Sequence, residues 1–167
     1  SILKAVEIKP NFSKAYSNLG LIQIDLGNLQ EAELSIRKAL ELNPNHANAH
    51  SNLGHIQLEL GYLKEAETSI RKAIELNPNN ENAHSYLGLL YIELGNLKKA
   101  EVSARKAIEL KPDFAVGHLN LGNILKDLGK LKEAEISLQK AIELNPDLAK
   151  AYEVLGLILL TKNDLDL

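Results

Sequence analysis

The sequence has no cysteine, methionine or tryptophan, and only 4% of its 167 residues are aromatic. The absence of cysteine excludes disulfide bonds, thiolate nucleophiles and cysteine-ligated zinc. The chain also lacks the apolar run of about 18 residues that a membrane-spanning helix needs, and no signal peptide is recognisable. We therefore predict a protein without a membrane partner, and the cytoplasm is the compartment that we favour.

The charges are nearly balanced, with a formal net charge of -3 and lysine interleaved with glutamate. This pattern gives no basic surface for a nucleic acid. No glycine-rich phosphate loop, HExxH or GxSxG motif is present. Charged residues instead recur four apart, as in Glu33, Arg37 and Glu41, which is typical of a solvated helix face. We predict a protein that is not an enzyme and that needs no cofactor.

Prolines recur every 34 residues, at Pro10, Pro44, Pro78, Pro112 and Pro146, and the glycines follow the same period. Such a period indicates a repeat architecture. We treat the whole chain as one array with a leading half repeat, four full repeats and a trailing half repeat. Their ranges are 1–12, 13–46, 47–80, 81–114, 115–148 and 149–167.

Each repeat has the pattern of two helices. In the second repeat we predict helices at 47–60 and 63–76, because apolar residues recur there at helical spacing. Gly61 can adopt the left-handed conformation that ends a helix, and the residue before Pro78 disfavours helical backbone. In the trailing half repeat Asn163 replaces the glycine, and we expect the same left-handed turn there.

The repeats open with AYSNLG, AHSNLG, AHSYLG, GHLNLG and AYEVLG, and this pattern resembles the tetratricopeptide repeat. The resemblance covers the whole chain. Its carriers are the prolines, Leu19/Gly20, Leu53/Gly54, Leu87/Gly88, Leu121/Gly122, Leu155/Gly156, and alanines 32, 66, 100, 134, 39, 73, 107 and 141. The family implies an all-α fold, a right-handed superhelical solenoid of 34-residue helix-turn-helix repeats whose concave wall is formed by the first helix of each repeat. It also implies a large aromatic early in the first helix, found here at Tyr16 and Tyr152; the middle repeats have histidine instead.

The histidines raise the possibility of a metal site, since His46 and His50 are four residues apart. On a helical wheel both fall opposite Asn48; we expect His50 to face the helix pair and His46 to lie in the turn before the helix. The equivalent histidines of successive repeats are at least one helix spacing apart, which is too far to share one zinc ion. We therefore predict structural roles for these histidines and no metal site.

The other face of the first helices presents polar residues to the expected concave wall. In the second repeat Asn48, Ser51, Asn52, His55 and Glu59 share this face. The column formed by Asn18, Asn52 and Asn120, interrupted by Tyr86, is similar to the asparagine ladder of repeats attached to O-linked N-acetylglucosamine transferases, where such amides bind a peptide backbone. The complete candidate set is Lys14, Asn18, Asp25, Asn48, Asn52, His55, Glu59, Asn82, Tyr86, Glu93, Asn120, Asn123 and Asp127.

The predicted function is a non-catalytic scaffold that binds an extended peptide or partner protein along the concave face. An amide both donates and accepts hydrogen bonds, so it can pair with a peptide without reading its side chains. The acidic residues at one edge favour a mildly basic peptide. Two alternatives stay open: a substrate-recruiting arm of a larger enzyme such as a glycosyltransferase, and a structural spacer or self-assembly module.

The half repeats suggest self-association, because each would expose an apolar surface that a neighbouring repeat normally covers. The chain starts at Ser1 and contains no methionine, so we expect it to be part of a longer protein. A head-to-tail contact between copies would generate open chains rather than closed dimers. We predict that Ile2, Val6 and Ile8 of one copy pack near Tyr152, Leu155, Leu159 and Leu160 of the next.

Overall fold

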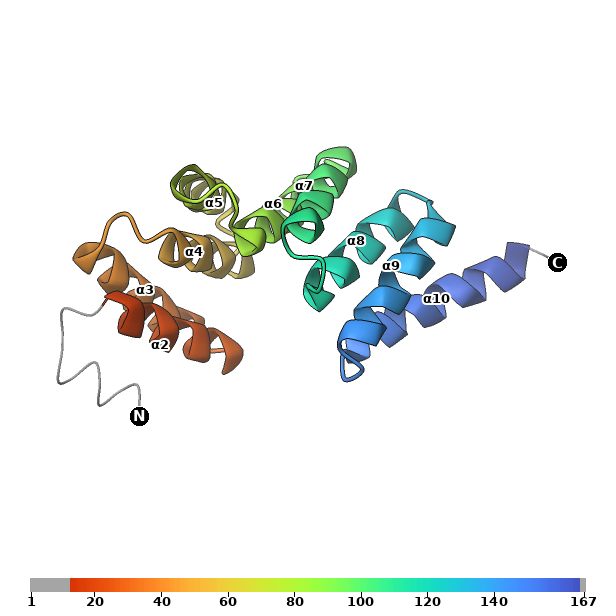
Figure 1. Ribbon diagram of the computed structural model, residues 1–167, viewed down its shortest axis with the longest axis horizontal. Helices are drawn as coiled ribbons and strands as arrows, with labels where there is room; N and C mark the ends of the chain where they lie inside the picture. Colours follow the sequence, from red (N-terminus) through yellow and green to blue (C-terminus); the bar gives the residue numbers. More distant parts are fainter. Residues whose placement is uncertain (1–12, 166–167) are drawn as a thin grey trace. The chain divides into compact units, whose positions relative to one another are not determined.

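The computed structural model describes the backbone of residues 13–165 and the side chains of residues 13–161. The leading half repeat, with Ile2, Val6 and Ile8, lies outside the described residues. Within the described part all regular structure is helical (Figure 1). The helices are α2 Ser13–Asp25, α3 Leu29–Leu42, α4 Ala47–Glu59, α5 Leu63–Leu76, α6 Glu81–Glu93, α7 Leu97–Leu110, α8 Ala115–Asp127, α9 Leu131–Leu144 and α10 Ala149–Leu165.

The chain divides into two compact units, and the boundary falls within α6, between Tyr86 and Leu87. In the N-terminal unit α2 packs against α3 and α4, and α4 packs against α5 (Figure 1). In the C-terminal unit α8 packs against α7 and α9, and α10 packs against both α8 and α9. The first helices α2, α4 and α8 are thus each paired with the second helix of their own repeat and also contact a helix of a neighbouring repeat.

The turn between paired helices depends on glycine, as the sequence predicted. Gly61 has a φ of +78°, and Gly27, Gly95 and Gly129 have φ values between +71° and +76°. After Gly61, the Tyr62 N–H donates to the Gln57 carbonyl at 2.8 Å, and the Gly61 N–H donates to the Leu58 carbonyl at 2.9 Å. These two bonds form a Schellman motif that satisfies carbonyls at the end of α4.

The predicted turn at Asn163 is wrong. Helix α10 continues through this position to Leu165. Glycine adopts left-handed and right-handed backbone about equally well, whereas asparagine still favours the right-handed form. At Asn163 the helix therefore continues, while the glycines at the equivalent positions end it.

A second set of glycines allows paired helices to approach closely. A Cβ atom on Gly54 would lie 2.5 Å from Cγ1 of Ile70, and Gly20 and Gly122 meet their partner side chains similarly. At Gly88 the partner is Ala104, and the nearest atom to an added Cβ would be 3.4 Å away. Glycine is therefore required sterically in three of these pairs, while at Gly88 there is room for a methyl group.

The outer face of the second helices carries ion pairs at spacings of four and of three residues. Arg37 pairs with Glu33 at 2.6 Å, as expected from the spacing of four. Glu41 instead pairs with Lys38 at 2.8 Å, because residues three apart also face each other on a helix. Such exposed pairs contribute about 0.2–0.5 kcal/mol each.

The histidines of the middle repeats make a recurring hydrogen bond. Nε2 of His50, His84 and His118 each lies 2.9 Å from the carbonyl oxygen of the proline six residues earlier. Because a carbonyl only accepts, the imidazole N–H donates in each case. The ring thereby ties the first helix to the preceding turn, which is a structural role.

Candidate functional site

Most candidate residues of the N-terminal unit meet at a pocket of about 290 Å³, whereas Asp25, His55 and Glu59 do not line it. Six residues of the predicted set line it: Lys14, Asn18, Asn48, Asn52, Asn82 and Tyr86. The remaining lining residues are Ser17, Leu21, His46, Ser51 and Asn80. The wall is therefore mostly amide and hydroxyl groups, which offer both donors and acceptors.

The first helices place these residues on one face by their spacing. Asn48 and Asn52 are four apart on α4, as Lys14 and Asn18 are on α2. The two amides of the predicted column differ in exposure: Asn18 is exposed, whereas Asn52 is only 6% exposed. The Asn52 Nδ2 donates to the Ser17 hydroxyl at 3.5 Å. Asn52 thus links two repeats as well as lining the pocket.

Two lining residues, His46 and Asn80, stand immediately before α4 and α6. The predicted place of His46 in the turn before the helix is confirmed, whereas the wheel direction opposite Asn48 is wrong, because both residues line the pocket. His46 is the N-cap of α4, with φ of -80° and ψ of 91°, so helical angles do not apply to it. Asn80 was missed altogether. Its signal in the sequence is its place just before a helix, where asparagine is favoured.

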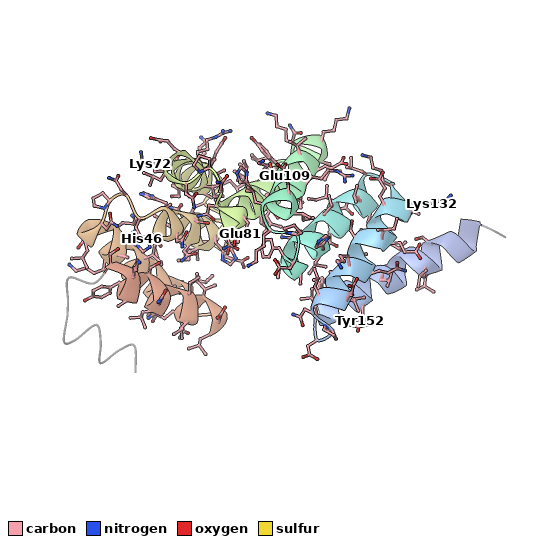
Figure 2. All side chains as sticks on the ribbon, viewed as in Figure 1. His46, Lys72, Glu81, Glu109, Lys132 and Tyr152 are labelled. Carbon is pink, nitrogen blue, oxygen red and sulfur yellow. The ribbon has the colours of Figure 1, made fainter. Side chains whose placement is uncertain are left out.

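Hydrogen bonds hold both of these residues at the pocket. The Ser13 hydroxyl donates to the Ala39 carbonyl at 2.8 Å, so His46 Nδ1–H must be the donor in its 2.8 Å bond to Ser13. Figure 2 shows His46 on the segment between α3 and α4. The Asn80 Oδ1 accepts from the Ala83 N–H at 3.0 Å, and its Nδ2 donates to Asn48 Oδ1 at 3.1 Å.

An aromatic stack lies next to the pocket, since Tyr86 is one of the lining residues. The rings of His55 and Tyr86 lie parallel, with centroids 4.4 Å apart and 7° between their planes. Burial lowers the pKa of His55, although Glu59 and Asp25 oppose this shift. Burial, reinforced by Asp25 and Glu59, raises the pKa of Tyr86 to about 12. At neutral pH both rings are uncharged, and they form a flat surface beside two carboxylates.

The other candidates, Glu93, Asn120, Asn123 and Asp127, belong to the C-terminal unit. Asn120 and Asn123 are half-buried, Glu93 is exposed, and Asp127 pairs with Lys126 at 3.2 Å. The two described pockets of that unit are lined by other residues. The walls of these pockets include apolar side chains such as Ile136 and Val102, and neither wall contains an asparagine.

The chemistry of the amide-lined pocket suits hydrogen-bonded recognition. Residues 13–161 contain no group of three histidine, cysteine, aspartate or glutamate side chains placed to hold a metal ion. No helix of the described part is long and apolar enough to cross a bilayer.

The His46 ring is held by Ser13, and burial lowers its pKa, with Lys14 and His50 acting in the same direction.

Family models described as tetratricopeptide repeat match most of the chain. One matches residues 13–46, 81–114 and 115–148, and a second matches residues 47–80. The search of curated protein sequences found no match.

Solved structures of tetratricopeptide proteins superpose on the chain. TTC0263 of Thermus thermophilus has 25% identity and a TM-score of 0.83, over 95% of this chain and 87% of its own. MamA has 28% identity and a TM-score of 0.65, over 89% and 87%. YrrB, described as having an unusual peptide-binding site, has 25% identity and a TM-score of 0.64, over 98% and 84%. The predicted all-α repeat solenoid is confirmed.

Proposed function

The chain belongs to the tetratricopeptide repeat family, whose general role is protein–protein interaction, and we propose that it binds an extended peptide segment of a partner protein on its first-helix face. The family generally acts as a non-catalytic scaffold. The surface that we assign to the peptide is the predicted concave face, centred on the pocket of the N-terminal unit.

The amide-lined pocket is the observation that carries this proposal. It combines five asparagines, Asn18, Asn48, Asn52, Asn80 and Asn82, with two serines in one wall. An extended peptide presents alternating N–H and C=O groups that such side chains can pair with, independently of its sequence. YrrB, with 25% identity, is described as having a peptide-binding site, which supports the same class of ligand.

The charge near the His55–Tyr86 stack favours a peptide with basic residues on that side. Asp25 and Glu59 are exposed and act on both rings. A lysine or arginine of the peptide could lie over the stack and close to these carboxylates, since cations are attracted to aromatic faces. We expect this contribution to weaken as salt is added.

The test is a peptide selection followed by asparagine replacement. A randomised peptide library is selected on the intact chain, and the best peptides are measured by fluorescence polarisation. Combined replacement of Asn18, Asn52 and Asn120 by alanine should reduce affinity, while replacement of the exposed turn residue Asn45 by alanine should not. Circular dichroism checks that each variant is folded.

The outcomes separate the alternatives. Binding that is unchanged by the triple replacement removes the proposed site, and failure to select any peptide favours a spacer. A substrate-recruiting arm would give the same binding result as an independent scaffold. It would be recognised by a catalytic domain in the sequence that adjoins this chain in the intact protein.

Self-association is a second candidate, favoured by apolar side chains on α10. Tyr152, Leu159 and Leu160 are 50%, 44% and 63% exposed, whereas Leu155 is half-buried against the core. Figure 2 shows Tyr152 near the beginning of α10. We infer that this surface contacts a second copy. Light scattering should rise with concentration and fall on Leu160→Glu; a flat signal up to millimolar protein would contradict it.

A further inference from the structure

The outer face of α9 carries an apolar side chain that the rest of the described structure leaves uncovered. Ile136 is 67% exposed and lies near the middle of this helix. It stands at the edge of a groove of about 560 Å³ that α7, α8 and α9 line together, and the more buried Ile108 and Leu121 also line it. A single exposed apolar residue needs no explanation by itself, so its neighbours decide whether this surface is a contact site.

The neighbours of Ile136 differ from those of the equivalent residues in the other second helices. These equivalents are Leu34 on α3, Thr68 on α5 and Val102 on α7. The residue three positions later is arginine in the other three helices and glutamine in α9: Arg37, Arg71, Arg105 and Gln139. Among α3, α5, α7 and α9, only α9 therefore combines an exposed apolar residue with an uncharged neighbour one turn away.

The two ends of the same helix face carry opposite charges. Lys132, Ile136, Gln139 and Glu143 follow one another at spacings of four, three and four, so they share one face. Lys132 is exposed in the first turn of α9 (Figure 2), and the Glu143 side chain is 69% exposed in the last turn. A face that is positive at one end and negative at the other is complementary to itself when two copies run antiparallel.

An antiparallel pair of α9 helices about a two-fold axis satisfies each of these side chains. Lys132 of each copy lies against Glu143 of the other, at both ends of the contact. At the centre the two Ile136 side chains are offset by three residues, roughly 4.5 Å along the helix axes, and so can pack together. They lie on the side of the face that borders the groove, so each covers the mouth of the other copy's groove.

The same axis brings the two Gln139 side chains close to each other. An arginine at this position would place two like charges together, which strongly opposes association. Arg37, Arg71 and Arg105 therefore exclude this pairing for the outer faces of the other second helices, although Leu34 and Val102 are as exposed as Ile136.

We propose that the outer face of α9 binds a second copy of this chain, and that the product is a closed two-fold dimer. The contact uses a second helix, so it depends neither on peptide binding by the first helices nor on the apolar surface of α10. A contact along one helix is smaller than the standard interface of about 800 Å² per partner, so the dimer is weak and forms between micromolar and millimolar concentrations. A closed dimer stops growing at two copies, whereas a head-to-tail contact through α10 continues to add copies.

Sedimentation equilibrium of the intact chain tests the proposal. The mass should rise with concentration and level off at twice that of the chain. Ile136→Glu and Gln139→Arg should each weaken the dimer at least tenfold, the second because it introduces the arginine of the other helices. Leu34→Glu, at the equivalent and similarly exposed position of α3, is the matched control and should change the dissociation constant less than twofold. Circular dichroism should show the same melting temperature for all three variants, since the replaced side chains are exposed.

Exchange of the end charges tests the antiparallel direction. Lys132→Glu should weaken the dimer about threefold or more, because a glutamate then faces Glu143 of the other copy at both ends. The double variant Lys132→Glu/Glu143→Lys should return to within twofold of the original affinity. Within one chain the two positions are eleven residues apart, roughly 16 Å along the axis, so this recovery reports a contact between copies.

Three results would overturn the proposal. One is a chain that stays monomeric up to millimolar concentration. Another is association that Leu160→Glu abolishes and Ile136→Glu leaves unchanged, which would assign the contact to α10. The third is a double charge variant that binds more weakly than Lys132→Glu alone. Peptide binding is measured independently with the asparagine variants, so its failure and the failure of the dimer are distinguishable.

Discussion

The N-terminal unit and the C-terminal unit place different side chains at equivalent repeat positions. Ser51 and Gln57 are buried polar residues of α4, and Leu119 and Leu125 replace them on α8. In the N-terminal unit the Ser69 hydroxyl donates to Gln57 Oε1 at 2.7 Å, so the buried amide is satisfied. The helices of both units nevertheless begin and end at equivalent positions.

This comparison shows that backbone geometry and surface chemistry are specified by different residues. The small residues that set the helix spacing are the same in both units: Ala66, Ala73, Ala134 and Ala141 are all fully buried. The first-helix positions are free to vary between polar and apolar as long as each buried polar group finds a partner. Ser51, the one exception among the described residues, marks the pocket.

The largest effect should separate two equivalent glycines. Gly54→Ala places a Cβ 2.5 Å from Ile70 and should destabilise by about 1–3 kcal/mol, as overpacking does. Gly88→Ala has room for the methyl group and should be neutral or stabilise by up to about 1 kcal/mol, because alanine favours helix. Urea midpoints measure both. Equal losses of stability in the two variants would show that Ala104, which stands where Ile70 stands in the N-terminal unit, leaves no additional room for a methyl group.

The buried amide gives the next effect. Gln57→Leu introduces the leucine that the C-terminal unit has at the equivalent position, Leu125. The buried Ser69 hydroxyl then loses its acceptor, which should lower the free energy of unfolding by about 1–3 kcal/mol. The double variant Gln57→Leu/Ser69→Ala should recover most of this loss. Thermal unfolding followed by circular dichroism compares the two. A double variant less stable than the single one would contradict the account of this pair.

Peptide affinity should depend more on the N-terminal unit. Asn18→Ala together with Asn52→Ala should weaken a selected peptide about tenfold, equivalent to about 1.4 kcal/mol, because two amides of the pocket are removed. Asn120→Ala should have a smaller effect, since apolar residues such as Leu119 accompany it. Fluorescence polarisation measures both. A larger loss from Asn120→Ala would move the binding site to the C-terminal unit.

The smallest effect concerns pH. Burial lowers the pKa of His55 below its ordinary value near 6.5, so the unfolded chain takes up a proton more readily than the folded one. Stability should therefore fall as pH decreases below about 6.5. His55→Phe keeps an aromatic partner for Tyr86 and should lose less stability between pH 7.5 and 5. Hydrogen exchange of α4 at the two pH values measures this; identical losses would exclude a contribution from His55.

The sequence predicted the helix pairs and the shared face of the candidate residues better than it predicted individual side-chain contacts. The turn at Gly61 and the helix at 63–76 agree with the structure, because they depend on backbone preferences that neighbouring residues dictate. Lys14, Asn18, Asn48, Asn52, Asn82 and Tyr86 share a pocket because residues four apart share a helix face. The wheel gave the wrong direction for His46, although its place in the turn was predicted, and Asn80 was missed. Both residues precede a helix, where the angles of a helical wheel do not apply.

The order of the helices, their breaks and their buried stripe were determined by the sequence alone, since proline, glycine and apolar spacing act locally. Only the tertiary structure decided which side chains meet. A wheel shows the direction of Tyr86 but not that its ring turns to His55 and leaves Ser51 without a partner. The wheel likewise gives no reason for glycine at position 117. In the structure a Cβ atom on Gly117 would lie 2.6 Å from the ring of Phe114, which explains the absence of a side chain there. Such contacts depend on the volume and position of neighbouring side chains, which close packing settles only once the helices are assembled.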